Sequence, residues 1–332
     1  MCGRYLREGE TVPERNVLAR SVPLKAEVRP PYRSWESGFR SRIGGVGTMN
    51  GELPSGILAD EILEPGPDRI RALVVSGGNP VRALPDREKA ERALRDLDLL
   101  VCIDTRMSDT ARLADYVIAP TMVYERPDHT LLMEFFFSEP FAQYTPRLVE
   151  PPPGVVEDWE FFYRLTVASG QRPKFAGRVL DPVVPPTSEE LLEMFAERGR
   201  IPFDELISAR RGVRAPRVEK IVEPPTDGGA HHRLALCPDD VASEIDAALQ
   251  ERDSVAAFPL ALTVRRAREL MNSLGRGIPG LARYGYNPAH VHPRDLERFG
   301  VAHGDIVRVR SRRGRYGRWC TPIAPWRPAP SR

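Results

Sequence analysis

Three short apolar segments give the clearest pattern along the chain. None of them alternates with polar residues, which is typical of strands that are covered on both faces. They are ALVVS at 72–76, LLVCI at 99–103 and YVIAP at 116–120. We therefore expect three buried strands in this region.

Helical patterns separate these strands. Residues 85–98, PDREKAERALRDLD, place apolar side chains on one helical face and have Asp86 as an N-cap. The segment SDTARLAD, 108–115, predicts a short helix with Ser108 as its N-cap. The apolar positions of the first helix are Ala90, Ala93, Leu94 and Leu97. The order β-α-β-α-β predicts an α/β fold with parallel strands and right-handed crossovers.

The rest of the chain divides by pattern into flanking regions. Residues 1–70 are rich in glycine and polar residues and predict loops, with one short helix at 55–66. The α/β domain is expected over 71–250, and its second half is helical between proline runs. Helices are predicted at 156–170, 187–199 and 239–253, the second with Thr187 and Glu190 at capping-box spacing.

A small β-barrel domain is expected over 255–332. FPLALTV, 258–264, predicts a strand, and Ile306, Val307 and Val309 interleave with arginines in a second strand. RWCTPIAPWRPAPSR lacks the barrel strand that should follow SRRGR, so we expect the domain to be truncated.

Composition removes several classes of function. The 332 residues are 41% hydrophobic with a net charge of +2, so a real core is expected and no charged partner is indicated. The 33 prolines favour long irregular connections. No apolar run could span a membrane, and the N-terminus lacks the apolar core of a signal peptide, so a cytoplasmic protein is expected.

Cysteine and histidine spacing argues against a metal site. The four cysteines are far apart, so no CxxC pair is available for zinc or iron–sulfur binding. His290 and His292 have neither the spacing of a zinc pair nor a third ligand. The arginines after Asp305 alternate with apolar residues. This pattern favours the exposed face of a strand over a nucleic-acid-binding arm. We expect neither a metal ligand nor a catalytic nucleophile.

Polar and glycine residues follow each strand of the predicted sheet. Because the carboxyl ends of parallel strands share one edge, where ligands bind in open α/β sheets, these turns should lie together. They are Gly77-Gly78-Asn79, Asp104-Thr105 and Pro120-Thr121. A carboxylate there suits ribose hydroxyls or the donor edge of guanine, and glycines let a phosphate approach the backbone. A tight turn and a capping Asp104 that bind no ligand are the alternative.

A second polar segment runs from Thr263 to Gly275. Its arginines, together with Asn272 and Ser273, suit a pyrophosphate. A solvated basic helix face is the alternative.

Three stretches together resemble the molybdopterin-dependent oxidoreductases, the family that binds bis(molybdopterin guanine dinucleotide). VVSGGNP is similar to a strand and turn of that family, and VCIDTRMSDTARLADYVIAPTMVYERPD to its next segment. YNPAHVHPRDLERFGVAHGDIVRVRSRRGR resembles its C-terminal dinucleotide-binding barrel, of the double-psi type. The resemblance extends loosely from residue 1 to about 315.

The resemblance implies a set of cofactor-binding residues. Gly77, Gly78 and Thr105 would line the strand-end turns, with Asn79 on phosphate or ribose and Asp104 on the nucleoside. Arg126 matches a basic position near the same nucleotide. The residues that would approach the pterins are Thr263, Arg265, Asn272 and Ser273.

The sequence also departs from the family pattern. It lacks the cysteine cluster for an iron–sulfur centre and the residue that ligates molybdenum, so no catalytic residue is expected on this chain. We expect the C-terminal part of a catalytic subunit, inactive alone and paired with a second chain that carries the missing ligands. A guanine-nucleotide-binding module and a non-functional gene fragment are the alternatives. Substrate, redox direction and oligomeric state are not specified by the sequence.

Overall fold

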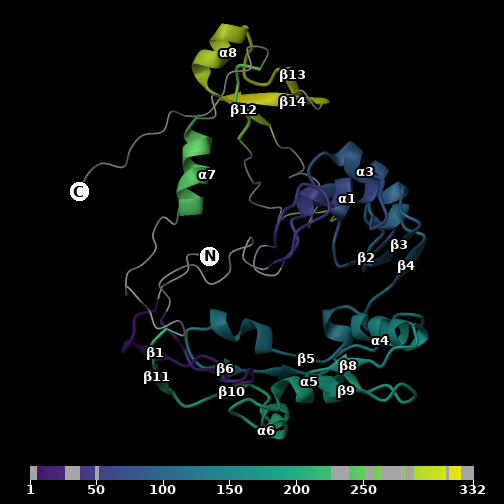
Figure 1. Cartoon of the computed structure of the whole chain (residues 1–332), viewed down its shortest axis with the longest axis vertical. Helices are drawn as coiled ribbons and strands as arrows, with labels where there is room; N and C mark the ends of the chain where they lie inside the picture. Colours follow the sequence, from purple (N-terminus) through teal and green to yellow (C-terminus); the bar gives the residue numbers. More distant parts are fainter. Residues whose placement is uncertain are drawn as a thin grey trace. The chain divides into compact units, whose positions relative to one another are not determined.

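The computed structural model describes part of the chain. The described residues are 6–26, 38–48, 52–225, 239–250, 258–263, 278, 280, 288–311 and 314–322. The chain divides into two compact units, which are treated separately below. Figure 1 labels their helices and strands. Unit 1 comprises residues 1–79 and 91–238, and unit 2 comprises residues 80–90 and 239–332.

A three-stranded parallel sheet in unit 1 confirms the central prediction. The strands β2 (Ala72–Ser76), β3 (Leu99–Ile103) and β4 (Tyr116–Ile118) lie in the order β2-β3-β4. All pairings are parallel. Burial on both faces holds only for residues 100–103 of the central strand β3, whereas Val74 of β2 is 38% exposed and Tyr116 of β4 is 63% exposed. Edge strands with fewer neighbours leave apolar side chains uncovered.

The helices before and after β2 largely match their predictions. A 3₁₀ turn, η2 (Ser55–Ile57), leads into α1 (Leu58–Leu63). After β2 come a four-residue helix, α2 (Pro80–Ala83), and α3 (Arg87–Arg95). Ala93 of α3 packs with Ala59 and Ile62 of α1, and the two helices lie side by side in Figure 1.

Two helix starts were predicted in this region. Asp86 caps α3, because its Oδ1 accepts a 3.3 Å hydrogen bond from the Lys89 N–H. The helix predicted at 108–115 is wrong in extent: the structure has only a 3₁₀ turn, η3 (Ala111–Leu113). Ser108 still accepts a hydrogen bond at its Oγ from the Ala111 N–H, at 3.2 Å.

The remainder of unit 1 consists of short strand pairs and helices. The antiparallel pairs are β1 (Thr11–Pro13) with β11 (Glu219–Ile221), β5 (Asp128–His129) with β7 (Tyr144–Thr145), β6 (Phe141–Ala142) with β10 (Val213–Arg214), and β8 (Lys174–Phe175) with β9 (Arg178–Val179). The helical elements are η4 (Val123–Glu125), η5 (Leu131–Phe136), α4 (Asp158–Ala168), α5 (Ser188–Ala196) and α6 (Phe203–Ser208). The capping box of Thr187 and Glu190 is confirmed at the start of α5.

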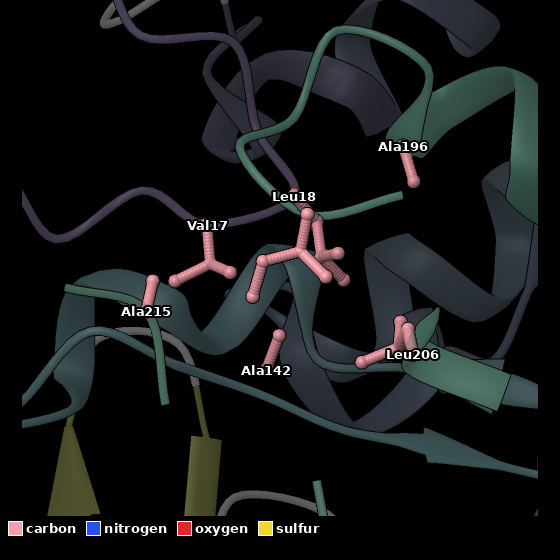
Figure 2. Packing of buried hydrophobic residues seen from close by; sticks show 7 residues of the cluster. Val17, Leu18, Ala142, Ala196, Leu206 and Ala215 are labelled. Carbon is pink, nitrogen blue, oxygen red and sulfur yellow. The ribbon is translucent and has the colours of Figure 1, made fainter. Parts of the chain in front are cut away.

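One buried cluster joins distant parts of unit 1. Val17 and Leu18, both fully buried, pack against residues from β6, from the end of α5, from α6 and from the chain after β10 (Figure 2). The other members of the cluster are Ala142, Ala196, Ile201, Leu206 and Ala215. The segment before residue 26 is therefore an integral part of the core of this unit.

Unit 2 contains a three-stranded sheet. Besides residues 80–90, which contain α2, its elements in the described residues are α7 (Asp239–Gln250), β12 (Ala289–Val291), α8 (Pro293–Phe299), β13 (Ile306–Ser311) and β14 (Gly314–Pro322). The order is β12-β14-β13, with β14 antiparallel to β13 and parallel to β12. No closed barrel is seen among the described residues, and the double-psi topology stays a prediction.

Two predictions for this region are wrong. The described residues 258–263 contain no strand. The strand expected to be missing after SRRGR is present as β14, which pairs with β13 from Ile306↔Trp319 to Ser311↔Gly314. The helices of the described segments are all too short, or too polar, to cross a bilayer.

Candidate functional site

The end of β2 forms an open glycine turn. The N–H of Gly77 donates a 2.9 Å hydrogen bond to the Ile103 carbonyl, which places the turn beside the end of β3. Gly77 has a φ of 62°, in the left-handed region that favours glycine. A Cβ atom added there would meet nothing within 4 Å. The turn therefore leaves room for a ligand to approach the backbone.

Asp104 lies at the end of the neighbouring strand. Its N–H donates to the Ile118 carbonyl at 3.2 Å, so it extends the ladder toward β4. Its Oδ1 accepts a 3.1 Å hydrogen bond from the Arg106 N–H, which fixes the carboxylate at the turn. Asp104 is partly buried, and Thr105 is exposed. Burial and the Asp104 charge raise the pKa of the Cys102 thiol to about 11, so this thiol is unsuited to nucleophilic chemistry.

Asn79 contacts the loop that follows Asp104. The Thr110 hydroxyl donates to Asn79 Oδ1 at 2.9 Å, and Asn79 Nδ2 donates to Asp109 Oδ2 at 3.4 Å. The strand ends are joined as the parallel sheet predicts, but the side-chain partners of Asn79 are Asp109 and Thr110. Sequence reasoning missed both, because the motif SDT was interpreted only as a helix start.

Two side chains that follow β4, Thr121 and Arg126, can donate hydrogen bonds but have no partner among the residues that the structure describes. The Thr121 side chain is 8% exposed, and its Oγ1 has no hydrogen-bond partner among the described residues. Arg126, at the end of η4, is partly buried and makes no hydrogen bond or ion pair within the described segments. A buried hydroxyl and a guanidinium without acceptors suit the oxygens of an anionic ligand. Thr121 was recognised as part of the third turn but not as a binding residue.

Of the polar segment from Thr263 to Gly275, which was predicted to bind a pyrophosphate, the structure describes only Thr263. Thr263 is exposed in the irregular segment 258–263 of unit 2. Arg265, Asn272 and Ser273 lie outside the described residues, so their role stays a prediction. Among the residues that are described, no group of three or more His, Cys, Asp or Glu side chains could hold a metal ion.

The donor set at the strand ends fits a nucleotide. The turn at Gly77 is open, Asp104 offers a carboxylate acceptor, and Thr121, after the end of β4, offers an O–H donor. Arg126 lies further along the chain, at the end of η4. Guanine and ribose present donors to such an acceptor, and phosphate accepts from such donors. Donors and acceptors of these kinds are compatible with a nucleotide ligand.

Two family models match the chain. The model described as molybdopterin oxidoreductase matches residues 25–167, which include all three strands of the parallel sheet and their terminal turns. The model described as molydopterin dinucleotide binding domain matches residues 260–317.

Two curated proteins that are similar to this chain are named for different activities. The alpha subunit of F420-dependent formate dehydrogenase 1 from Methanococcus maripaludis is 24% identical over 274 residues, covering 78% of this chain and 37% of that protein. The assimilatory nitrate reductase catalytic subunit from Bacillus subtilis is 28% identical over 314 residues, covering 89% of this chain and 42% of that protein. The chain thus spans about two fifths of the length of these relatives.

A solved structure shares the fold. Acetylene hydratase from Pelobacter acetylenicus matches with a TM-score of 0.57 and 18% identity, covering 82% of this chain and 38% of that one. The two family models lie in the order that the sequence motifs indicated, and the matched strand-end turns carry a donor set that fits a nucleotide. From these findings together, the chain belongs to the molybdopterin oxidoreductase family.

Proposed function

We propose that the strand-end turns of the parallel sheet bind the guanine dinucleotide part of a molybdopterin cofactor. One observation carries the proposal: the open turn at Gly77 lies beside the end of the strand that leads to Asp104, through the hydrogen bond from Gly77 to Ile103. A backbone that is accessible to phosphate and a carboxylate that accepts from a nucleoside thus occur at the same edge.

Each residue has a distinct part in this proposal. The backbone of Gly77 and Gly78 admits a phosphate, and Arg126 neutralises its charge. Asp104 accepts hydrogen bonds from guanine or ribose, with Thr105 beside it. The part of Thr263, Arg265, Asn272 and Ser273 in binding the pterins stays the expectation that the sequence resemblance gives. When bound, the cofactor supplies molybdenum chemistry, in which the metal changes oxidation state.

We propose further that this chain does not act alone. Its cysteines are dispersed at positions 2, 102, 237 and 320, so they do not form an iron–sulfur motif, and Cys102 is buried. The iron–sulfur and molybdenum ligands would come from a polypeptide segment outside these 332 residues. The chain would then act as the C-terminal part of a catalytic subunit in the cytoplasm. The named relatives include a formate dehydrogenase and a nitrate reductase, so similarity does not select a substrate.

The test measures the cofactor directly. The chain is purified from a host that makes the cofactor, molybdenum is measured by mass spectrometry, and GMP is released by acid hydrolysis. Asp104→Ala should lower the GMP content. Asp68→Ala is the matched control, because Asp68 is exposed outside the strand-end turns.

The outcomes separate the alternatives. GMP with molybdenum in the wild type and in Asp68→Ala, but reduced in Asp104→Ala, supports the proposal. GMP without molybdenum would favour a guanine-nucleotide-binding module. A folded wild-type chain that carries no GMP would contradict binding by this chain and favour the reading of a fragment without function.

A further inference from the structure

The side chain of Asn79 is held by the loop that follows β3. The Thr110 hydroxyl donates to Asn79 Oδ1 at 2.9 Å, and Asn79 Nδ2 donates to Asp109 Oδ2 at 3.4 Å. Asn79 stands 31 residues before Thr110 in the chain. The contact therefore links the turn after the first strand of the sheet to the loop after the second.

Thr110 is itself rigidly placed. It has no exposed surface, and it precedes the 3₁₀ turn η3, where its carbonyl accepts from the Leu113 N–H at 2.9 Å. One residue later, the Ala111 N–H donates to the Ser108 Oγ at 3.2 Å. A hydroxyl presented by a buried, hydrogen-bonded turn can fix the conformation of the group that it contacts.

The two contacts define which end of the Asn79 amide faces which neighbour. An asparagine amide has one acceptor oxygen and an NH₂ group with two donors. Because Asp109 is a carboxylate, it accepts from Nδ2, and the Thr110 hydroxyl then satisfies Oδ1. In this orientation the acceptor oxygen is engaged by the protein, and the second N–H of Nδ2 has no acceptor among the residues that the structure describes. The reverse orientation would set Oδ1 against the Asp109 carboxylate.

We propose that Thr110 and Asp109 are positioning residues that fix the Asn79 amide as a hydrogen-bond donor toward the phosphate or ribose oxygens of the bound nucleotide. This inference rests on the proposed function of the strand-end turns. It assigns a role to two residues that do not themselves contact the ligand.

The test uses the full chain and GDP as the probe. Thr110→Val keeps the shape of the buried side chain but removes the donor, and Thr110→Ser restores the hydroxyl. Loss of one positioning hydrogen bond should weaken GDP binding about tenfold in Thr110→Val. Thr110→Ser should stay within about twofold of the wild type, since its hydroxyl can donate in the same way. Thermal unfolding of each variant reports whether the fold is kept.

A double-mutant cycle distinguishes positioning from a general effect on structure. In an Asn79→Ala background, Thr110→Val should cause no further loss of GDP affinity, because its effect passes through Asn79. Equal losses in both backgrounds would overturn the proposal, as would unchanged affinity in a folded Thr110→Val chain.

A second readout needs no ligand. The side-chain amide resonance of Asn79, assigned by its disappearance in Asn79→Ala, should shift in Thr110→Val and return toward its wild-type position in Thr110→Ser. An unshifted resonance in Thr110→Val would overturn the inference even if the chain binds GDP. A wild-type chain that binds neither GDP nor the cofactor would instead overturn the proposed function, and the positioning role with it.

Discussion

The Oε1 atom of Glu134 accepts a 2.6 Å hydrogen bond from the backbone N–H of Leu18, which lies 116 residues earlier in the chain. The Oε2 atom of the same carboxylate accepts from the N–H groups of Val17 and Ala19, at 3.0 and 3.2 Å. Glu134 is 1% exposed. Three successive backbone dipoles thus stabilise a buried negative charge and hold Val17 and Leu18 in the core.

Removing the Glu134 carboxylate should strongly destabilise unit 1. Glu134→Ala leaves buried N–H groups without an acceptor, and the free energy of unfolding should fall by about 3 kcal/mol or more. Glu134→Gln keeps one oxygen acceptor, so a smaller loss of about 1–2 kcal/mol is expected. Urea denaturation measures both. Glu193→Gln, an exposed glutamate of α5, is the control and should change stability by less than about 0.5 kcal/mol. Equal stability of all three variants would contradict this role.

The pair of Glu14 and Lys220 should make stability depend on acid pH. Burial alone would raise the pKa of Glu14, but hydrogen bonds from Lys220, Ser21 and the Asn16 N–H outweigh it and lower the pKa below its usual value of 4.5. A lowered folded-state pKa gives stability that is present above pH 4.5 and is lost as the pH falls through the folded-state value. Urea midpoints measured from pH 7 downward should show this loss.

Lys220→Met tests the cause of that dependence. Without the lysine, burial should raise the pKa of Glu14, so the loss of stability should begin at a higher pH than in the wild type. The variant should also be less stable at neutral pH, because it leaves a buried carboxylate without its cation. An acid limb that coincides with that of the wild type would argue against the coupling.

Cys102 should be inert at neutral pH and should lower stability at alkaline pH. Its pKa is raised from 9.0 to about 11 by burial and by the Asp104 charge. Between these values the unfolded chain loses the thiol proton while the folded chain retains it, so stability falls as the pH rises from 9.0 to about 11. Cys102→Ala should remove that part of the slope. Alkylation followed by peptide mass spectrometry should find Cys102 unmodified at pH 7.5 in the folded chain and modified after denaturation.

Gly212 and Gly170 provide a matched test of close packing. Both have a positive φ, 74° and 71°, so alanine is strained at either position. A Cβ at Gly212 would lie 2.5 Å from the Phe141 ring and 2.6 Å from the Ala142 carbonyl oxygen, whereas Gly170 has nothing within 4 Å. Gly170→Ala should cost about 1 kcal/mol of stability. Gly212→Ala should cost about 1–3 kcal/mol more because of overpacking. Similar unfolding temperatures for the two variants would contradict the difference.

The sequence pattern predicted correctly those elements that depend on residues close together in the chain. The three strands of the parallel sheet follow from uninterrupted apolar runs, and the caps at Asp86 and Thr187 follow from short-range spacing. The strand β14 was missed because its sequence, GRYGRWCTP, has glycine, arginine and proline in place of a clear alternation. Its pairing with β13 and β12 is a tertiary interaction, which overrides weak local propensity.

Only part of the candidate site could likewise be predicted from the sequence. The turns at Gly77 and Asp104 were predictable, because strands that run parallel must end at one edge. The contacts from Asn79 to Asp109 and Thr110 were not, because they depend on how the loop after β3 folds back. The unused donor of Thr121 likewise becomes visible only when burial is known.

The pairing of β1 with β11 bears on how unit 1 is made on the ribosome. The first strand of the described residues, β1, pairs with β11, and Lys220 donates a hydrogen bond to the Val22 carbonyl across 198 residues. During synthesis, the packing around Val17 and Leu18 therefore stays incomplete until Ala215 and β11 have been made. Contacts of such long range slow folding and prolong the exposure of apolar surface. The nascent chain of this unit should therefore expose apolar surface until synthesis of the unit is nearly complete.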